Sequence, residues 1–121
     1  MKKYLFVISI LLTILSCKKD KVPSPTVVPV NCQLEDTISY ANQIQPILSN
    51  NCLPCHQYPG SGGINLDTYV NAKSIALSGQ LVQSIIHDTN YIIMPPLPQN
   101  QLDSCQIKAV KRWVLQGCLD N

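Results

Sequence analysis

The chain has 121 residues, enough for one small domain, with nine basic and seven acidic side chains and a formal net charge of +2. From residue 32 onward, four basic and six acidic side chains give a net charge of −2, so the positive balance comes from the N-terminal residues. Nothing in this balance favours nucleic-acid binding, which needs a clustered basic face.

Residues 1–16 are predicted to be a lipoprotein signal peptide that is removed. Residues 1–3 are basic, and residues 4–15 are almost wholly apolar but, at about a dozen residues, too short for a permanent membrane span. Residues 14–17, Ile-Leu-Ser-Cys, resemble a bacterial lipobox, whose cysteine is acylated and becomes the new N-terminus. Lipidation of Cys17 implies stable membrane anchoring, because several acyl chains bury many methylene groups. An ordinary cleaved signal is the alternative.

Residues 17–31 combine lipidated Cys17 with a proline-rich segment, which predicts an extended tether, and residues 32–121 form the predicted domain. Apolar residues recur at helical spacing over about 40–50, 68–78 and 80–87, and again after Asp103. Pro46 is tolerated only in the first turn of a helix, so a start as late as Gln45 is the alternative for the first helix. No strand pattern is present, and we expect a small all-α domain with long loops and a thin core.

The last helix has the clearest end signals. Asp103 is a good N-cap, and Gln106 three residues later completes a capping-box pattern. Gly117 is placed to end the helix in a left-handed conformation. We therefore expect a helix from about residue 104 to about residue 116.

The sequence Cys52-Leu53-Pro54-Cys55-His56 is a C-x-x-C-H motif, which is typical of covalent haem attachment. Two thiols at this spacing on a helical turn match the two haem vinyl groups, and His56 then follows directly as the proximal iron ligand. A thioredoxin-like motif would need a βαβ context, which the pattern lacks. A zinc site would need a second pair of ligands, for which only His87 and a spare cysteine are available.

A sixth iron ligand is expected on a downstream loop. After removal of the signal peptide, Met94 is the only methionine, and Pro95 and Pro96 follow it directly. A methionine is more often a core gap-filler, but one followed by two prolines in a loop is less easily explained that way. His87 is the competing ligand; its place near a helix end is also typical of a histidine that interacts with free carbonyl groups.

From about Ile38 to Gly117 the chain resembles the mono-haem class I cytochrome c family, in particular its short lipoprotein forms of Bacteroidetes type. Besides the C-x-x-C-H motif, the matching pieces are Ile44-x-Pro46-Ile47, Gly62-Gly63-Ile64-Asn65-Leu66, Met94-Pro95-Pro96 and Trp113-Val114. The resemblance implies a helical domain wrapped around one haem c, with crossed first and last helices and His56/Met94 ligation. Many members have a downstream proline whose carbonyl accepts the ring N–H of the proximal histidine. Pro59 stands closer than usual, so that partner of His56 stays open.

The remaining cysteines are Cys32, Cys105 and Cys118. Cys105 and Cys118 stand at opposite ends of the last predicted helix, roughly 20 Å apart at 1.5 Å per residue, which is too far for a disulfide. Cys32 can then reach either of them. The resemblance implies Cys32–Cys105, because related lipoprotein forms have a cysteine near each of these positions.

The predicted function is a single-electron carrier, tethered to a membrane of the bacterial cell envelope and facing the periplasm or the surface. With both axial positions filled by His56 and Met94, substrate has no access to the iron, and we expect no enzymatic activity. The expected partners are redox proteins such as a dehydrogenase, an oxidase or another cytochrome, and no nucleic acid. Two alternatives remain: a small-ligand sensor in which Met94 is labile, and an electron-entry subunit of a larger redox complex.

Overall fold

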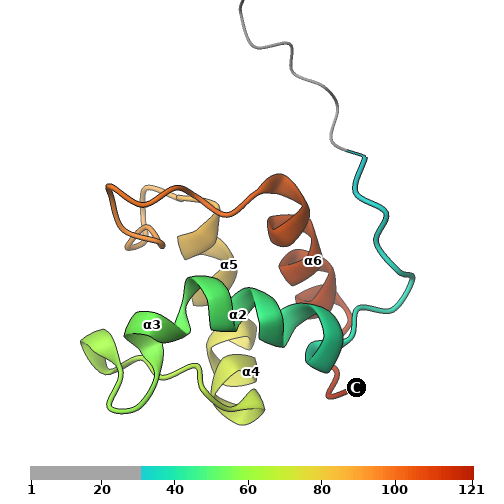
Figure 1. The fold of residues 1–121 in the computed structure, drawn as a ribbon, viewed down its shortest axis with the longest axis horizontal. Helices are drawn as coiled ribbons and strands as arrows, with labels where there is room; N and C mark the ends of the chain where they lie inside the picture. The colour runs from blue at the N-terminus through green and yellow to red at the C-terminus, as the bar shows by residue number, and fades with distance from the viewer. Residues whose placement is uncertain (1–30) are drawn as a thin grey trace, which may run out of the picture.

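The computed structural model describes residues 31–121 (Figure 1). The predicted signal peptide, the lipidation site Cys17 and most of the tether lie outside these residues. Every regular element among residues 31–121 is helical and none is a strand, which confirms the all-α prediction. In chain order the elements are η1 (Tyr40–Ile44), α2 (Gln45–Asn51), α3 (Leu53–His56), η2 (Ser61–Gly63), α4 (Tyr69–Leu77), α5 (Gln80–Ile85) and α6 (Ser104–Leu115).

The N-terminal helix begins with a wide turn before its α-helical part. Residues of η1 form a π-helical turn, in which the N–H of Ile44 donates to the Ser39 carbonyl at 3.2 Å. The α-helix α2 then begins at Gln45, with Pro46 in its first turn. Proline lacks an N–H and crowds the carbonyl four residues earlier, and a widened turn accommodates both effects. The single predicted helix over 40–50 is therefore two differently wound segments.

The helices α4 and α5 follow each other closely. The side chain of Thr68 caps α4 by accepting from the N–H of Asn71, and Gly79, with φ +83°, separates the two helices. The helix α5 ends at Ile85, before the predicted end at His87. His87 has φ +60°, a left-handed conformation that a continuing α-helix cannot include. The chain turns there and leaves the helix for the long segment that contains Met94.

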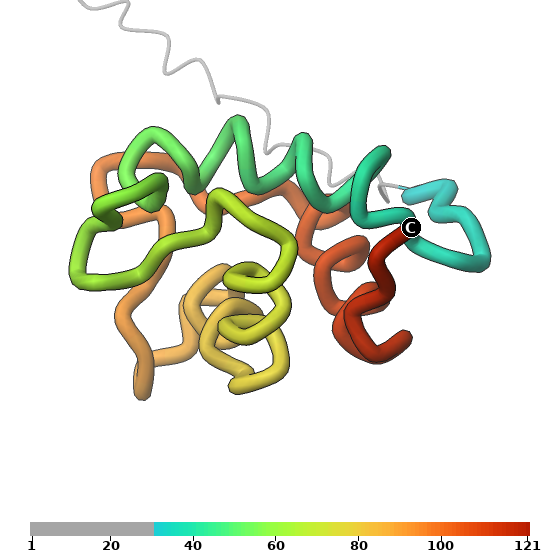
Figure 2. The backbone as a smooth tube through the Cα atoms, turned by 90° about the horizontal axis from the view of Figure 1, so that it is seen from below, coloured from blue at the N-terminus to red at the C-terminus, as the bar shows by residue number. Residues whose placement is uncertain are grey.

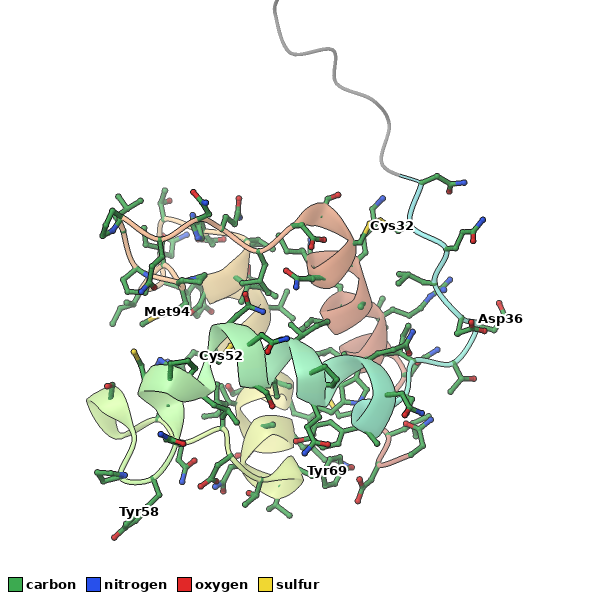
Figure 3. All side chains as sticks on the ribbon, in the orientation of Figure 1. Cys32, Asp36, Cys52, Tyr58, Tyr69 and Met94 are labelled. Atoms are coloured by element: carbon green, nitrogen blue, oxygen red, sulfur yellow. A yellow bond between two sulfur atoms is a disulfide. The ribbon has the colours of Figure 1, made fainter. Side chains whose placement is uncertain are left out.

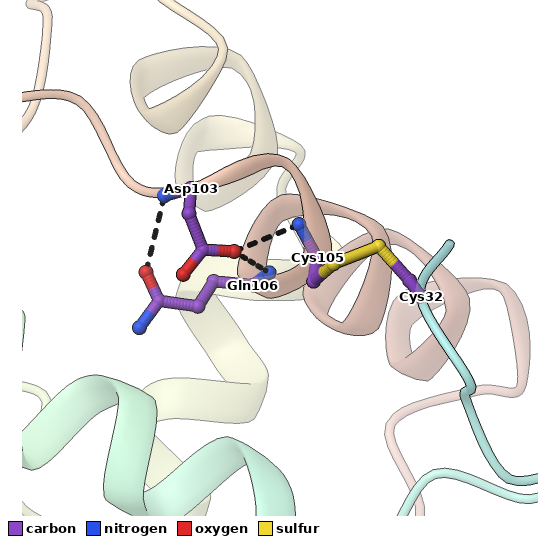
Figure 4. Close-up of a disulfide and its surroundings, with 4 residues drawn as sticks. All are labelled: Cys32, Asp103, Cys105 and Gln106. Carbon is purple, nitrogen blue, oxygen red and sulfur yellow. Dashed lines mark hydrogen bonds between the residues drawn. A yellow bond between two sulfur atoms is a disulfide. The ribbon is translucent and has the colours of Figure 1, made fainter. Parts of the chain in front are cut away.

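The helix α6 has both predicted end signals. The side chain of Asp103 accepts from the N–H groups of Cys105 and Gln106, and the Gln106 side chain accepts from the N–H of Asp103, which completes the capping box (Figure 4). At the other end, Gly117 has φ +84° and donates to the Val114 carbonyl. The N–H of Cys118 donates to the Trp113 carbonyl at 2.9 Å, so the end is a Schellman motif.

The core is centred where the first and last helices pack together. The helices η1 and α6 are in contact, and the ring of Tyr40 lies 5.5 Å from the fully buried Trp113 ring, centroid to centroid. The start of η1 and the C-terminus lie next to each other (Figure 2), where Asn121 accepts hydrogen bonds from the N–H groups of Tyr40 and Ala41. This arrangement joins the first helix to the C-terminus beside one aromatic cluster.

A disulfide joins Cys32 to Cys105, in the first turn of α6, with the two Cα atoms 5.4 Å apart (Figure 4). The alternative pairing of Cys32 with Cys118 is not formed, and the thiol of Cys118 is free and buried at the other end of α6. The N–H of Ile38 donates to the side-chain oxygen of Gln116, and the side-chain amide of Gln116 donates to the Asp36 carbonyl. These bonds hold the non-helical segment 31–39 along α6.

Candidate functional site

The C-x-x-C-H motif forms one tight helical turn. Cys52 ends α2 and precedes α3, and its carbonyl accepts from the N–H of Cys55 at 3.1 Å and from the N–H of His56 at 2.8 Å. Pro54 lies in the first turn of α3, where a missing N–H costs nothing. The motif is thus a short, locally rigid unit that holds Cys52, Cys55 and His56 together.

A cavity of about 370 Å³ opens beside this turn. Its lining includes all four residues predicted from the sequence to hold a cofactor: Cys52, Cys55, His56 and Met94. The walls are mainly apolar and come from several parts of the chain. The apolar lining residues include Ile64, Leu66, Ile75, Leu81, Ile85 and Leu102. Among residues 31–121, no lysine, arginine, aspartate or glutamate lines it. Volume and lining fit a site for an apolar organic group oriented by a few polar contacts.

Met94 reaches the cavity from a segment remote in sequence from the motif. In Figure 3 it lies on the loop above the α2–α3 segment that carries Cys52. The N–H of Met94 donates to the Ser84 carbonyl in α5 at 3.0 Å, and the side chain of Gln101 donates to the Ile85 carbonyl at 2.9 Å. Two hydrogen bonds therefore attach this non-helical loop to α5 and hold Met94 at the cavity.

His87, the competing ligand, does not line the cavity. Its ring nitrogen Nε2 is buried and has no hydrogen-bond partner within residues 31–121. Met94 therefore shares the cavity with the C-x-x-C-H turn, and His87 does not.

The ring of His56 is oriented by a backbone carbonyl. Its Nδ1 lies 3.1 Å from the carbonyl oxygen of Ile64, and the N–H of Leu66 donates back to the His56 carbonyl at 2.7 Å. Because a carbonyl can only accept, Nδ1 must carry the ring proton in this contact. The lone pair of Nε2 is then available for a metal, an arrangement common among histidine ligands. Ile64, rather than Pro59, supplies the acceptor that the sequence left open.

The Cys52 thiol is not set up for thiol–disulfide exchange. Burial raises the pKa of the Cys52 thiol to about 11. Exchange needs a thiolate, and reactive C-x-x-C thiols have lowered pKa values, so Cys52 is a poor nucleophile at neutral pH. Cys52 and Cys55 are both unpaired in the structure. Both sulfur atoms can therefore form a covalent bond to another group.

The zinc alternative also lacks support in the geometry. Among residues 31–121, no three His, Cys, Asp or Glu side chains gather closely enough to hold a metal ion. A structural zinc site needs four such ligands. The side chains that line the cavity include instead two thiols, one imidazole and one thioether, spaced too widely for a small ion. This set fits a haem, which brings its own four nitrogen ligands to the iron.

Comparison with family models, with curated proteins and with solved structures finds no match for this chain. In the part of the chain that the structure describes, no helix combines the length and apolar character needed to cross a bilayer.

Proposed function

We propose that this protein binds one haem covalently through Cys52 and Cys55 and carries single electrons. The observation that supports the proposal best is that Met94, remote in sequence, lines the same cavity as Cys52, Cys55 and His56. The chemistry of these four side chains matches two thioether bonds and two axial iron ligands.

Each of the four residues has a distinct role in the proposal. The thiols of Cys52 and Cys55 would hold the haem by adding to its two vinyl groups, with each S–H hydrogen going to a vinyl carbon. His56 would offer Nε2 to the iron while the Ile64 carbonyl accepts a hydrogen bond from Nδ1–H, and Met94 would offer its sulfur as a second protein ligand. The bound haem supplies an iron that alternates between two oxidation states one electron apart. Apolar walls such as Leu81 and Ile85 exclude water and lower the local dielectric constant.

The proposed setting follows from the N-terminal sequence. We propose that the helical domain, built like a class I cytochrome c, is tethered by acylated Cys17 to a membrane of the bacterial cell envelope, facing the periplasm or the surface. With both axial positions filled, the protein is a carrier between redox partner proteins and has no enzymatic activity of its own.

Covalent attachment is tested by intact mass under denaturing conditions. The full chain is produced in a host that attaches haem to exported proteins. We expect a mass that exceeds the processed, acylated polypeptide by one haem, and haem staining of the band on a denaturing gel. The double substitution Cys52→Ala/Cys55→Ala should abolish both signals, while Cys118→Ala, which removes a free thiol elsewhere, should keep them. Complete extraction of the haem from the wild-type chain by acidified solvent would refute covalent attachment.

A further inference from the structure

Gly60 stands in the loop between the haem motif and α4, against the carbonyl that holds the His56 ring. A Cβ atom built at Gly60 would lie only 2.4 Å from the carbonyl oxygen of Ile64 and 2.9 Å from its carbonyl carbon. Both contacts are with backbone, which cannot swing aside as a flexible side chain could. A residue with any side chain at position 60 therefore requires Ile64 to move.

The backbone of Gly60 points to the same requirement. Its φ of +74° and ψ of 122° lie outside the small left-handed region that other residues can visit, in conformations open to glycine. Its N–H donates to the Gln57 carbonyl, and its carbonyl accepts from the N–H of Gly63 at 3.3 Å. The loop thus folds back on itself at Gly60, and this fold brings the Ile64 carbonyl toward the motif helix.

We propose that Gly60 is a positioning residue for His56. Because Gly60 has no side chain, the Ile64 carbonyl can approach the His56 ring closely enough to accept a hydrogen bond from Nδ1–H. As a statement about an iron ligand, this inference rests on the proposed function. The hydrogen bond makes His56 a stronger donor to a metal, because a ring that shares its Nδ1 proton has more negative charge at Nε2. Stronger donation favours the oxidised iron and lowers the reduction potential.

Gly63 provides a matched control. It lies in the same loop with the same φ of +74°, but a Cβ built there meets nothing within 4 Å, and it does not line the cavity. The variants Gly60→Ala and Gly63→Ala therefore both place a side chain on a residue with positive φ, and only Gly60→Ala adds the contact with Ile64. Both are made as full-length, haem-loaded proteins.

The readouts are the reduction potential and the solvent exchange of the His56 Nδ1 proton, followed by NMR. In Gly60→Ala we expect a more positive potential than in Gly63→Ala, and exchange roughly tenfold faster, as for the loss of one ordinary hydrogen bond. A second outcome also supports the proposal: Gly60→Ala fails to fold, Gly63→Ala folds, and the Nδ1 proton is protected in the wild type. This result would show that a side chain at position 60 is incompatible with the position of the Ile64 carbonyl. Equal potentials and exchange rates in the two variants, or an unprotected proton in the wild type, would overturn the proposal.

Failure of the proposed function gives a different result. If the wild-type chain carries no haem, the tautomer of His56 is measured by ¹⁵N NMR in the haem-free full chain. The inference about Gly60 then predicts an Nδ1–H ring in the wild type and in Gly63→Ala, and loss of this preference in Gly60→Ala. The same tautomer in all three chains would contradict it.

Discussion

At the scale of single residues, substitutions of Met94 and His87 distinguish the two candidates for the second iron ligand. Met94 lines the cavity and His87 does not, so we expect Met94→Ala to lower the reduction potential and open the iron to added ligands. The drop should be on the order of 0.1 V, a fraction of the roughly 0.8 V that axial ligands span, because a thioether favours the reduced iron. His87→Ala should leave the spectrum and potential nearly unchanged. A high-spin spectrum in His87→Ala together with a low-spin one in Met94→Ala would show that the ligands are reversed.

The residues of the candidate site could be predicted from the sequence where a side chain, and not the backbone, supplies the functional group. The C-x-x-C-H spacing and the single methionine before two prolines name the four residues that the structure brings to one cavity. The Ile64 carbonyl could not be found in this way, because every residue has a carbonyl and only the loop path decides which one meets His56. The glycines at 60, 62 and 63 were the available signal, since glycine allows backbone to approach closely.

At the scale of elements, helix ends marked by a capping side chain, a proline or a glycine were predictable, and ends without such a local signal were not. The Asp103–Gln106 capping box and the Gly117 terminus fix α6, because their signals are local. The end of α5 at Ile85 depends on His87 adopting a positive φ, which no local pattern of a histidine indicates. The π-helical turn before α2 likewise reflects how the chain accommodates Pro46 within the packed N-terminal helix.

The disulfide between segment 31–39 and α6 gives a prediction for stability. Cys32 and Cys105 are 73 residues apart in sequence, and closing a loop of this length removes entropy from the unfolded chain worth about 4 kcal/mol in the chain-entropy model. The double variant Cys32→Ser/Cys105→Ser should lower the free energy of unfolding by up to about that amount, measured by denaturant titration.

Peptide mapping without reduction provides the control for this bond. It should recover a Cys32–Cys105 peptide pair and an alkylated Cys118, because among residues 31–121 only the Cys118 thiol would remain free in the haem-loaded protein. A Cys32–Cys118 pair, or an undiminished stability of the double serine variant, would contradict the assignment.

At the scale of the whole molecule, the core and the cavity share their residues. Leu66, Leu81, Ile85 and Leu102 belong to the buried core and also line the cavity. A small domain buries little surface by itself, so an apolar group in the cavity would add to the same core and stabilise the folded state. The thin core expected from the sequence would thus be completed by the proposed haem.

Membrane attachment is a separate prediction, because Cys17 lies outside the described residues. Cys17→Ser should release the protein from membranes into the soluble fraction with its haem retained, since the domain and the anchor are joined only by the tether. Cys118→Ser should stay with the membranes. The distribution is measured by fractionation and immunoblotting. Wild-type protein that takes up no labelled fatty acid would contradict the lipid anchor.

The most direct test of electron transfer by a His56/Met94-ligated haem is an optical redox titration of the purified, full-length protein. The account predicts one reversible step of about 59 mV per tenfold change in the ratio of oxidised to reduced protein, as for a single electron. It also predicts six-coordinate low-spin spectra in both states, without uptake of carbon monoxide by the reduced form. A high-spin reduced form that binds carbon monoxide rapidly would contradict the carrier and favour a small-ligand sensor.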